Sequence, residues 1–179
     1  MVSDEDLLRL AVRTGRHLLA GGVRMVTAES CTAGWIAKVL TDVPGSSDWF
    51  ECGYVCYSNA AKQRDLGVQA ATLEGQGAVS EPAVREMALG ALERTGAALA
   101  IAVSGIAGPT GAVAGKPVGT VWFALAHRRG RAVELNARVK FFKGDRDAVR
   151  RKSVQFALQL VLGLELPELA TASIPSAGN

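Results

Sequence analysis

Hydrophobic and polar positions follow two different periods along this chain. In the first 22 residues, leucine, alanine and valine recur at helical spacing behind an acidic turn that follows Ser3. Ser3 therefore caps a predicted helix that ends at Gly21-Gly22. The same signals predict four more helices, which are the stretch after Gly34 through residue 40, residues 58–66, residues 80–94, and a last helix capped by Asp145.

Short apolar runs between these helices predict β-strands. They cover 23–28, 50–57, 98–103, 118–126 and 132–142, the last two forming a hairpin that turns at Arg128-Arg129-Gly130. Helices that alternate with buried strands, plus one hairpin, predict an α/β fold with a mixed β-sheet covered on both faces. Since no repeat or long break divides the chain, we expect one domain over 1–165 and a frayed tail over 166–179.

Composition and charge narrow the function classes. Of the 179 residues, 49% are hydrophobic and 21% are charged, which is typical of a soluble globular domain. A net charge of +3 permits an anionic ligand such as a phosphate and does not require nucleic acid. The basic clusters 128–131 and 146–152 lack interleaved aromatic residues, as solvated faces do. Weak nucleic-acid binding is an alternative that rests on these clusters alone.

The cysteines and the N-terminus indicate a compartment. Cys31, Cys52 and Cys56 are odd in number and form no Cys-x-x-Cys motif, which favours a reducing environment. Cys52 and Cys56 lie four positions apart in a predicted strand, so we expect them on one face as buried apolar side chains. The acidic N-terminus is unlike a signal peptide, and no apolar run approaches the roughly 18 residues of a membrane span. The expected location is the cytoplasm.

The histidine content argues against two common kinds of active site. His17 falls in the first helix and His127 at the end of a strand, and neither has the neighbours of a metal ligand or a triad base. No group of carboxylates stands out at the strand ends. We therefore expect no metal and no cofactor, and a Ser-His-Asp triad is excluded.

Ser30 and Lys62 are the candidate nucleophile and base. Ser30 is predicted where a strand gives way to a helix, so that unpaired N–H groups, those of Cys31 and Thr32 first, would stabilise an oxyanion. With no usable histidine, Lys62 is the remaining base if burial keeps it neutral. Taken singly, Ser30 is better explained as an N-cap serine and Lys62 as a solvated surface lysine.

Binding residues are less clearly marked. The glycine-rich loop 104–111 resembles a phosphate cradle only weakly, because it lacks both the P-loop ending and the dinucleotide spacing. Its backbone amides suit a small anion. Arg146 opens a helix after Gly144-Asp145, where it suits a phosphate or a carboxylate. Tyr57 is either a hydrogen-bond donor and ring platform or an ordinary half-buried strand residue.

Seven segments occur in an order that is similar to a known family. They are TAESCTAG at 27–34, GSS at 45–47, GYVCYSNAAK at 53–62, GAVSE at 77–81, SGIAGP at 104–109, KPVGTVW at 116–122 and GDR at 144–146. The set resembles the C-terminal domain of the CinA competence/damage-inducible proteins and the free-standing nicotinamide-nucleotide amidases of the PncC type. The resemblance covers about residues 5 to 163.

The resemblance implies a three-layer α/β/α sandwich that hydrolyses the carboxamide of nicotinamide mononucleotide to nicotinate mononucleotide and ammonia, without a metal. Carried over by position, the nucleophile falls on Ser30 and the base on Lys62, and supporting positions fall on Tyr57, Ser104 and Arg146, with Gly105 beside Ser104. The family usually has glycine where this chain has Ala33, and often threonine in place of Ser104. Ala33 is expected in the first helical turn, where its methyl group would tighten the pocket.

Three further expectations follow. The CinA N-terminal domain has no counterpart among these residues, so its pyrophosphatase activity is not expected. The apolar hairpin edge suggests a homodimer, and no nucleic-acid or membrane partner is expected. The main alternative to the amidase is a catalytically silent relative that binds a nucleotide or a protein, since a fold does not dictate an activity.

Overall fold

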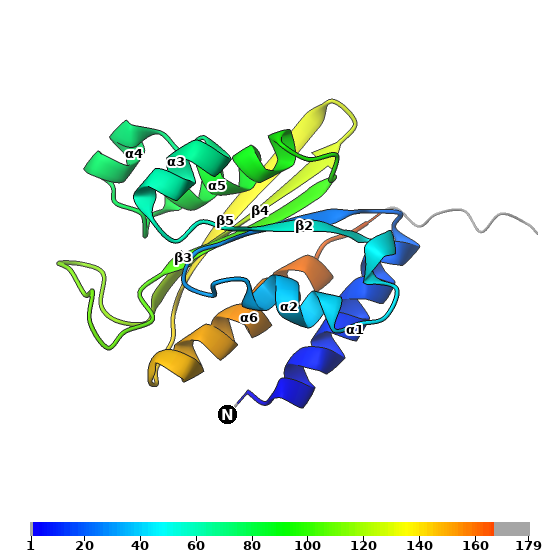
Figure 1. Ribbon diagram of the computed structural model, residues 1–179, viewed down its shortest axis with the longest axis horizontal. Coiled ribbons are helices and arrows are strands. Elements are labelled where there is room, and N and C mark those ends of the chain that lie inside the picture. The colour runs from blue at the N-terminus through cyan, green and yellow to red at the C-terminus, as the bar shows by residue number, and fades with distance from the viewer. Residues whose placement is uncertain (1, 167–179) are drawn as a thin grey trace, which may run out of the picture.

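The structure, a computed structural model, describes residues 2–166 and consists of one five-stranded β-sheet with helices on both faces (Figure 1). The strands are β1 (Met25–Glu29), β2 (Phe50–Val55), β3 (Leu99–Gly105), β4 (Thr120–Arg129) and β5 (Ala132–Phe141). The helices are α1 (Asp4–Ala20), α2 (Trp35–Thr41), η1 (Ser46–Asp48), α3 (Asn59–Leu66), α4 (Ala70–Gly75), α5 (Glu81–Glu93) and α6 (Arg146–Leu162).

The sheet is mixed, in the order β2-β1-β3-β4-β5. β1 pairs in parallel with β2 and with β3, whereas β4 runs antiparallel to both β3 and β5. Helices α1, α2 and α6 cover one face, and α3, α4 and α5 cover the other (Figure 1). This arrangement confirms the predicted three-layer α/β/α sandwich.

Alternation along the central strands decides which layer each side chain joins. In β3, Leu99, Ile101 and Val103 pack into the core beneath α1, α2 and α6. The intervening Ala100 and Ala102 face the opposite core, which α5 covers with small residues of its own. Because these side chains are small, α5 packs close to the sheet. The same alternation decides which face of the sheet the side chains just beyond the strand ends point to.

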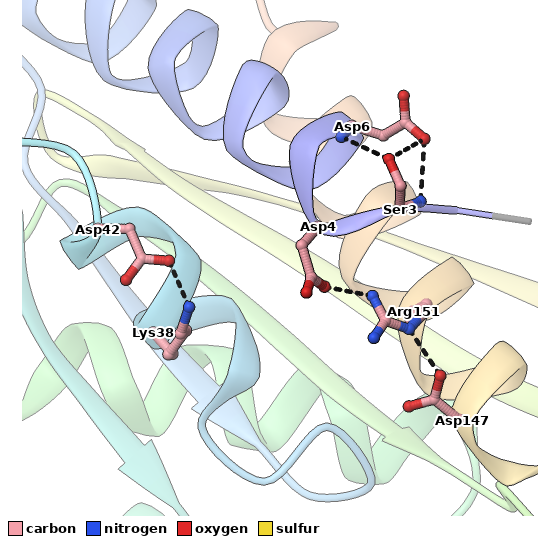
Figure 2. A network of polar contacts seen from close by, with 7 residues as sticks. All are labelled: Ser3, Asp4, Asp6, Lys38, Asp42, Asp147 and Arg151. Carbon is pink, nitrogen blue, oxygen red and sulfur yellow. Dashed lines mark hydrogen bonds and ion pairs between the residues drawn. The ribbon is translucent and has the colours of Figure 1, made fainter.

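The predicted helix caps are present. Ser3 and Asp6 form a capping box at the start of α1, Ser80 caps α5, and Asp145 caps α6. Arg151 links α6 to the N-terminal turn of α1, because its guanidinium pairs with Asp4 of α1 as well as with Asp147 of its own helix (Figure 2). Two helices far apart in sequence are thus fixed side by side on one face of the sheet.

Several predicted boundaries were wrong. The helix predicted after Gly34 does begin at Trp35, but residues 31–34, where Ala33 was expected in a first helical turn, form a turn that ends with Gly34 at a positive φ of 85°. Strand β2 ends at Val55, so Cys56 lies beyond it and does not share a strand with Cys52. The short helices η1 and α4 were not predicted. The predicted tail at 166–179 lies outside the described residues except for Leu166.

Candidate active site

Ser30 and Lys62 meet at the carboxyl end of β1. The Lys62 Nζ donates a hydrogen bond of 3.1 Å to the Ser30 Oγ across 32 positions of sequence. Ser30 continues β1, since its N–H donates to the Val103 carbonyl of β3, and parity turns its side chain toward the α3 side of the sheet. Lys62 is 1% exposed and Ser30 is 8% exposed. An alcohol and a buried amine therefore share one enclosed contact.

The burial of Lys62 follows from the way α3 packs. Ser58 caps the helix through a bond from the Ala61 N–H to its Oγ, and Gly67 ends it in a left-handed conformation. Only Lys62 and Leu66 are buried along α3, and four positions place them on the same face. Leu66 packs into the core beneath α5, so the helix face that carries Lys62 turns inward with it.

The surroundings of Lys62 favour the uncharged amine. Burial lowers the pKa of Lys62 below its usual value. Among residues 2–166, no carboxylate lies within ion-pair distance of its Nζ; its other partners are the carbonyl oxygens of Cys56, at 2.9 Å, and Tyr57, at 3.2 Å. When the amine is neutral, its two hydrogens bond these two carbonyls, and the Ser30 contact reverses: the hydroxyl then donates to the lone pair of the Lys62 nitrogen.

The N-terminus of α2 is occupied by a carboxylate of the protein. The Glu29 side chain, 0% exposed, accepts hydrogen bonds from the N–H groups of Ile36, at 3.0 Å, and Ala37, at 2.8 Å. It also accepts one from the Thr32 Oγ1 at 2.7 Å. The Glu29 side chain, and not the Ser30 hydroxyl, therefore binds the first free N–H groups of α2. The prediction that the Ser30 hydroxyl lies at a helix N-terminus was wrong.

The predicted oxyanion donors lie in the turn itself. Within the described range, the N–H groups of Cys31 and Thr32 have no oxygen acceptor, while the next amide, that of Ala33, donates to the Ser30 carbonyl at 3.1 Å. Both unused amides follow Ser30 directly in the chain. They therefore suit the role of oxyanion donors without any help from the helix dipole.

Cys31 is a poor candidate for a second nucleophile beside Ser30. Its side chain is 5% exposed and belongs to the core on the α2 and α6 side of the sheet. Burial raises the pKa of the Cys31 thiol to about 12, so the reactive thiolate is suppressed at neutral pH. Cys56 is also buried, and its thiol pKa is raised for the same reason.

Tyr57 and Arg146 come together above this end of the sheet. An Arg146 guanidinium nitrogen donates to the Tyr57 hydroxyl at 3.0 Å, and another donates to the Gly108 carbonyl at 2.8 Å. Tyr57 is 60% exposed, so the pair lies at the surface. Arginine carries five N–H donors, so Arg146 retains donors for an anionic ligand beside the glycine-rich loop.

Ser104 and Gly105 have structural partners. The Ser104 Oγ donates to the Ala78 carbonyl at 2.8 Å and is buried on the same side of the sheet as Ser30. Gly105 pairs with Val121 in the β3–β4 ladder, and a Cβ there would lie 2.7 Å from the Val121 Cγ2. Close packing of β3 on β4 therefore accounts for the glycine, and the substrate-binding role of both residues stays a prediction.

Ala33 differs from its expected placement. It has a φ of 53°, in the left-handed region that glycine adopts without strain, which explains why glycine suits this position. Its side chain is exposed in the turn before α2, not in a helical turn. The expectation that its methyl group tightens the pocket was therefore wrong.

Two residues that contact the Ser30 turn were missed from the sequence. Glu29 had a usable signal, since a carboxylate at the end of an apolar strand is buried only where donors surround it. Arg150 of α6 had none. Its Nε donates to the Cys31 carbonyl at 3.1 Å and a terminal nitrogen donates to the Thr32 carbonyl at 3.0 Å.

Neither a cluster of metal-binding side chains nor a membrane-spanning helix occurs in residues 2–166. In residues 2–166, histidine, cysteine and carboxylate side chains nowhere gather in threes around a common point. The His17 Nε2 donates a hydrogen bond to the Leu164 carbonyl, and the buried His127 lies beside Arg129. Across the same residues, no helix has both the length and the apolar character needed to cross a bilayer.

Sequence comparison finds close relatives of this chain. The family described as the CinA C-terminal domain matches residues 8–164. The nicotinamide-nucleotide amidohydrolase PncC of Escherichia coli K12 is 53% identical over 158 residues, which span 88% of this chain and 94% of that protein. The PncC of Pseudomonas putida is 48% identical over 160 residues, which span 89% of this chain and 98% of that protein.

Solved structures of similar proteins have the same fold. The competence damage-inducible protein A of Klebsiella pneumoniae matches with a TM-score of 0.82 at 41% identity, covering 88% of this chain and 96% of that one. A competence/damage-inducible protein of Agrobacterium tumefaciens matches with a TM-score of 0.81 at 41% identity, covering 89% and 94% of the two chains. The agreement extends over nearly all of the described residues.

Proposed function

This chain belongs to the CinA C-terminal domain family, and on that premise we propose that it is an amidohydrolase that deamidates nicotinamide mononucleotide through Ser30 and Lys62. The products are nicotinate mononucleotide and ammonia. Relatives about half identical to this chain carry the name nicotinamide-nucleotide amidohydrolase, which supports the reaction class. The observation that carries the mechanism is the contact between the buried Lys62 amine and the Ser30 hydroxyl.

The first half of the reaction forms an ester. Neutral Lys62 takes the Ser30 proton while the Oγ attacks the carboxamide carbon, and the N–H groups of Cys31 and Thr32 bind the oxyanion. The protonated Lys62 then gives its proton to the departing nitrogen, which leaves as ammonia. The cationic pyridinium ring of the substrate withdraws electrons from the carbonyl carbon. Brought near Lys62, its charge further favours the neutral amine.

The second half releases the acid. Lys62, neutral again after ammonia has left, takes a proton from a water molecule that attacks the nicotinoyl ester. The ester bond to Ser30 breaks, and the proton returns from Lys62 to the Oγ. One amine thus serves as base and acid in both halves, which requires that it change protonation state easily. The lowered pKa of Lys62 supports this role.

The phosphate of the nucleotide is proposed to bind Arg146. Its guanidinium is already oriented by the Tyr57 hydroxyl and the Gly108 carbonyl, so fewer rotamers are lost when the phosphate binds. Charge-assisted bonds from arginine suit a phosphate dianion. Ser104 and the amides of the 104–111 loop are proposed to complete this side of the site.

The test is ammonia release from nicotinamide mononucleotide. The wild-type chain is expected to release one ammonia per nicotinate mononucleotide formed, with and without EDTA, and Ser30→Ala is expected to lose at least about a thousandfold in kcat. Cys31→Ala is the matched control and should retain activity. A panel of related nucleotide amides then defines the substrate range.

The outcomes separate the alternatives. Ser30→Ala activity within about tenfold of the wild type would exclude covalent catalysis by this residue. No ammonia from any nucleotide amide, with nucleotide binding retained in calorimetry, would instead identify a catalytically silent relative. Loss of activity with EDTA would contradict the metal-free mechanism.

A further inference from the structure

Arg150 contacts the turn that follows Ser30, residues 31–34, from the helix layer opposite the one that carries Lys62. It lies on α6, on the face of the sheet away from Lys62, and its guanidinium donates to two consecutive carbonyls, those of Cys31 and Thr32. It also stacks over the Trp35 ring at 4.9 Å. Arg151 stacks on the same ring but pairs with Asp4 and Asp147 (Figure 2), whereas Arg150 makes no ion pair with a carboxylate in residues 2–166.

We propose that Arg150 is a positioning residue that orients and polarises the Thr32 N–H as an oxyanion donor. The proposal rests on the proposed function of Ser30 as nucleophile. A peptide unit is planar and trans, so its C=O and N–H bonds point in opposite directions. Because the Cys31 carbonyl points to Arg150, the N–H of the same unit, which belongs to Thr32, points away from α6. The face opposite α6 is the one that α3, the helix that carries Lys62, covers (Figure 1).

Of the peptide units that Arg150 contacts, only the one between Cys31 and Thr32 has an N–H that is free to bind an oxyanion. The Thr32 carbonyl is also held by Arg150, but the N–H of that unit belongs to Ala33 and is used in closing the turn on the Ser30 carbonyl. The Thr32 N–H has no oxygen acceptor among the described residues. A guanidinium bound to the carbonyl draws electron density along the peptide, which makes the N–H a stronger donor.

The electrostatics of the turn explain why a cation is needed there. Glu29 is buried next to the 31–34 turn and accepts hydrogen bonds from the N–H groups at the N-terminus of α2. A carboxylate in that place offsets the helix dipole and opposes a second negative charge forming nearby. Arg150 places a positive charge on the turn without an ion pair to neutralise it. It therefore supplies the electrostatic support that the helix end does not.

The experiment uses the covalent labelling of Ser30 by a fluorophosphonate, in which the Oγ displaces fluoride from phosphorus and the phosphoryl oxygen occupies the oxyanion site. Arg150→Gln is expected to slow labelling by roughly 10- to 100-fold, which is less than the roughly 100- to 1000-fold loss when an oxyanion donor is removed outright, because the Thr32 N–H stays in place. Arg150→Lys, which keeps the charge but not the two-carbonyl contact, should fall between. Arg151→Gln is the matched control, since it removes a neighbouring charge from the same ring and leaves the turn untouched.

A second readout separates positioning from mere stabilisation of the fold. With nicotinamide mononucleotide, Arg150→Gln should lower kcat by about the same factor as labelling and leave KM unchanged, because the donor acts on the developing oxyanion. If Arg150→Gln does not fold at the assay temperature, Arg150→Lys decides alone. Equal rates for Arg150→Lys and wild type would then contradict the proposal.

Each outcome bears on one idea or the other. Wild-type labelling rates in both Arg150 variants, or equal losses in Arg150→Gln and Arg151→Gln, would overturn the role of Arg150. Failure of the wild type to label at Ser30 would overturn it as well. Labelling that depends on Arg150, in a chain that releases no ammonia from nicotinamide mononucleotide, would remove the proposed substrate and leave Arg150 supported.

Discussion

A single buried amine illustrates how strongly the surroundings of a residue decide its chemistry. On a helix surface, Lys62 would be an ordinary solvated cation. Held at 1% exposure against Ser30 and two carbonyl oxygens, it becomes a group whose charged form is disfavoured. Glu29 is also fully buried, and three hydrogen bonds satisfy its side-chain oxygens. The pH dependence of Lys62 and a substitution of Glu29 test these two environments.

The pKa of Lys62 leads to a prediction about pH. Because burial lowers this pKa below 10.5, kcat/KM for nicotinamide mononucleotide should rise with pH and level off above the folded-state pKa. The unfolded chain binds more protons at position 62 between the folded-state pKa and 10.5, so the free energy of unfolding should rise with pH there. Urea unfolding at several pH values, with Lys62→Met as the reference, measures this difference. A difference that falls with rising pH would contradict the lowered pKa.

Glu29→Gln tests the buried carboxylate. A glutamine side chain presents one oxygen and one amide group, so at least one of the three donors around position 29 faces another donor. We expect the free energy of unfolding to fall by about 1–3 kcal/mol in urea titrations. The control is Glu51→Gln on β2, whose exposed ion pair with Arg24 should contribute less than about 1 kcal/mol. Equal effects in the two variants would show that the Glu29 contacts are dispensable.

At the scale of elements, the site depends on a close contact between two helices. A Cβ on Gly90 of α5 would lie 1.8 Å from the Leu66 carbonyl oxygen at the end of α3. The backbone of α3 therefore rests directly on α5, and the glycine sets how deeply Lys62 is placed. Strand β1, which pairs in parallel with β3, leads into Ser30 and directs its side chain to the α3 side of the sheet. The turn before α2 then presents the N–H groups of Cys31 and Thr32.

Gly90→Ala should therefore affect stability and activity together. The added methyl group must push α3 outward, so we expect a loss of at least about 2 kcal/mol in the free energy of unfolding. A shift of Lys62 by about 1 Å is expected to lower kcat by roughly 100-fold. Gly75→Ala at the end of α4 meets open space and should stay within about 1 kcal/mol of wild type. Unchanged kcat in Gly90→Ala would show that α3 does not need this contact.

At the scale of the whole molecule, residues from four separate parts of the chain converge on one end of the sheet. The Ser30 turn, the start of α3, the loop after β3 and the start of α6 each contribute contacts. The predicted dimer stays a prediction. Edge strand β5 does expose Val133 and Phe141, as the sequence pattern suggested.

Because the site spans the whole fold, activity should disappear only when the domain unfolds. Trp49 is 4% exposed and packs in the core with α1, so its fluorescence follows global unfolding. We expect the urea midpoints of tryptophan fluorescence, to which Trp35 and Trp122 also contribute, and of ammonia release to coincide, as in a two-state domain. A lower midpoint for activity would show instead that α3 or the 106–118 loop opens on its own.

The sequence by itself determined the five strands and the longer helices, though not η1 or α4, together with the α/β class and the candidate residues Ser30 and Lys62. These depend on local signals, namely caps, glycine stops, apolar periods and ordered motifs, which act within a few residues. It did not determine that residues 31–34 form a turn, since Ala33 must adopt a left-handed conformation that few side chains take.

Only the tertiary structure decided which partners complete the site. The Ser30–Lys62 contact spans 32 positions, and Arg150 reaches Cys31 across 119. Contacts of this range depend on how α3 and α6 pack on opposite faces of the sheet, and packing is a sum over many weak interactions that no local pattern records. The burial that lowers the pKa of Lys62 is a property of that packing and not of the residue.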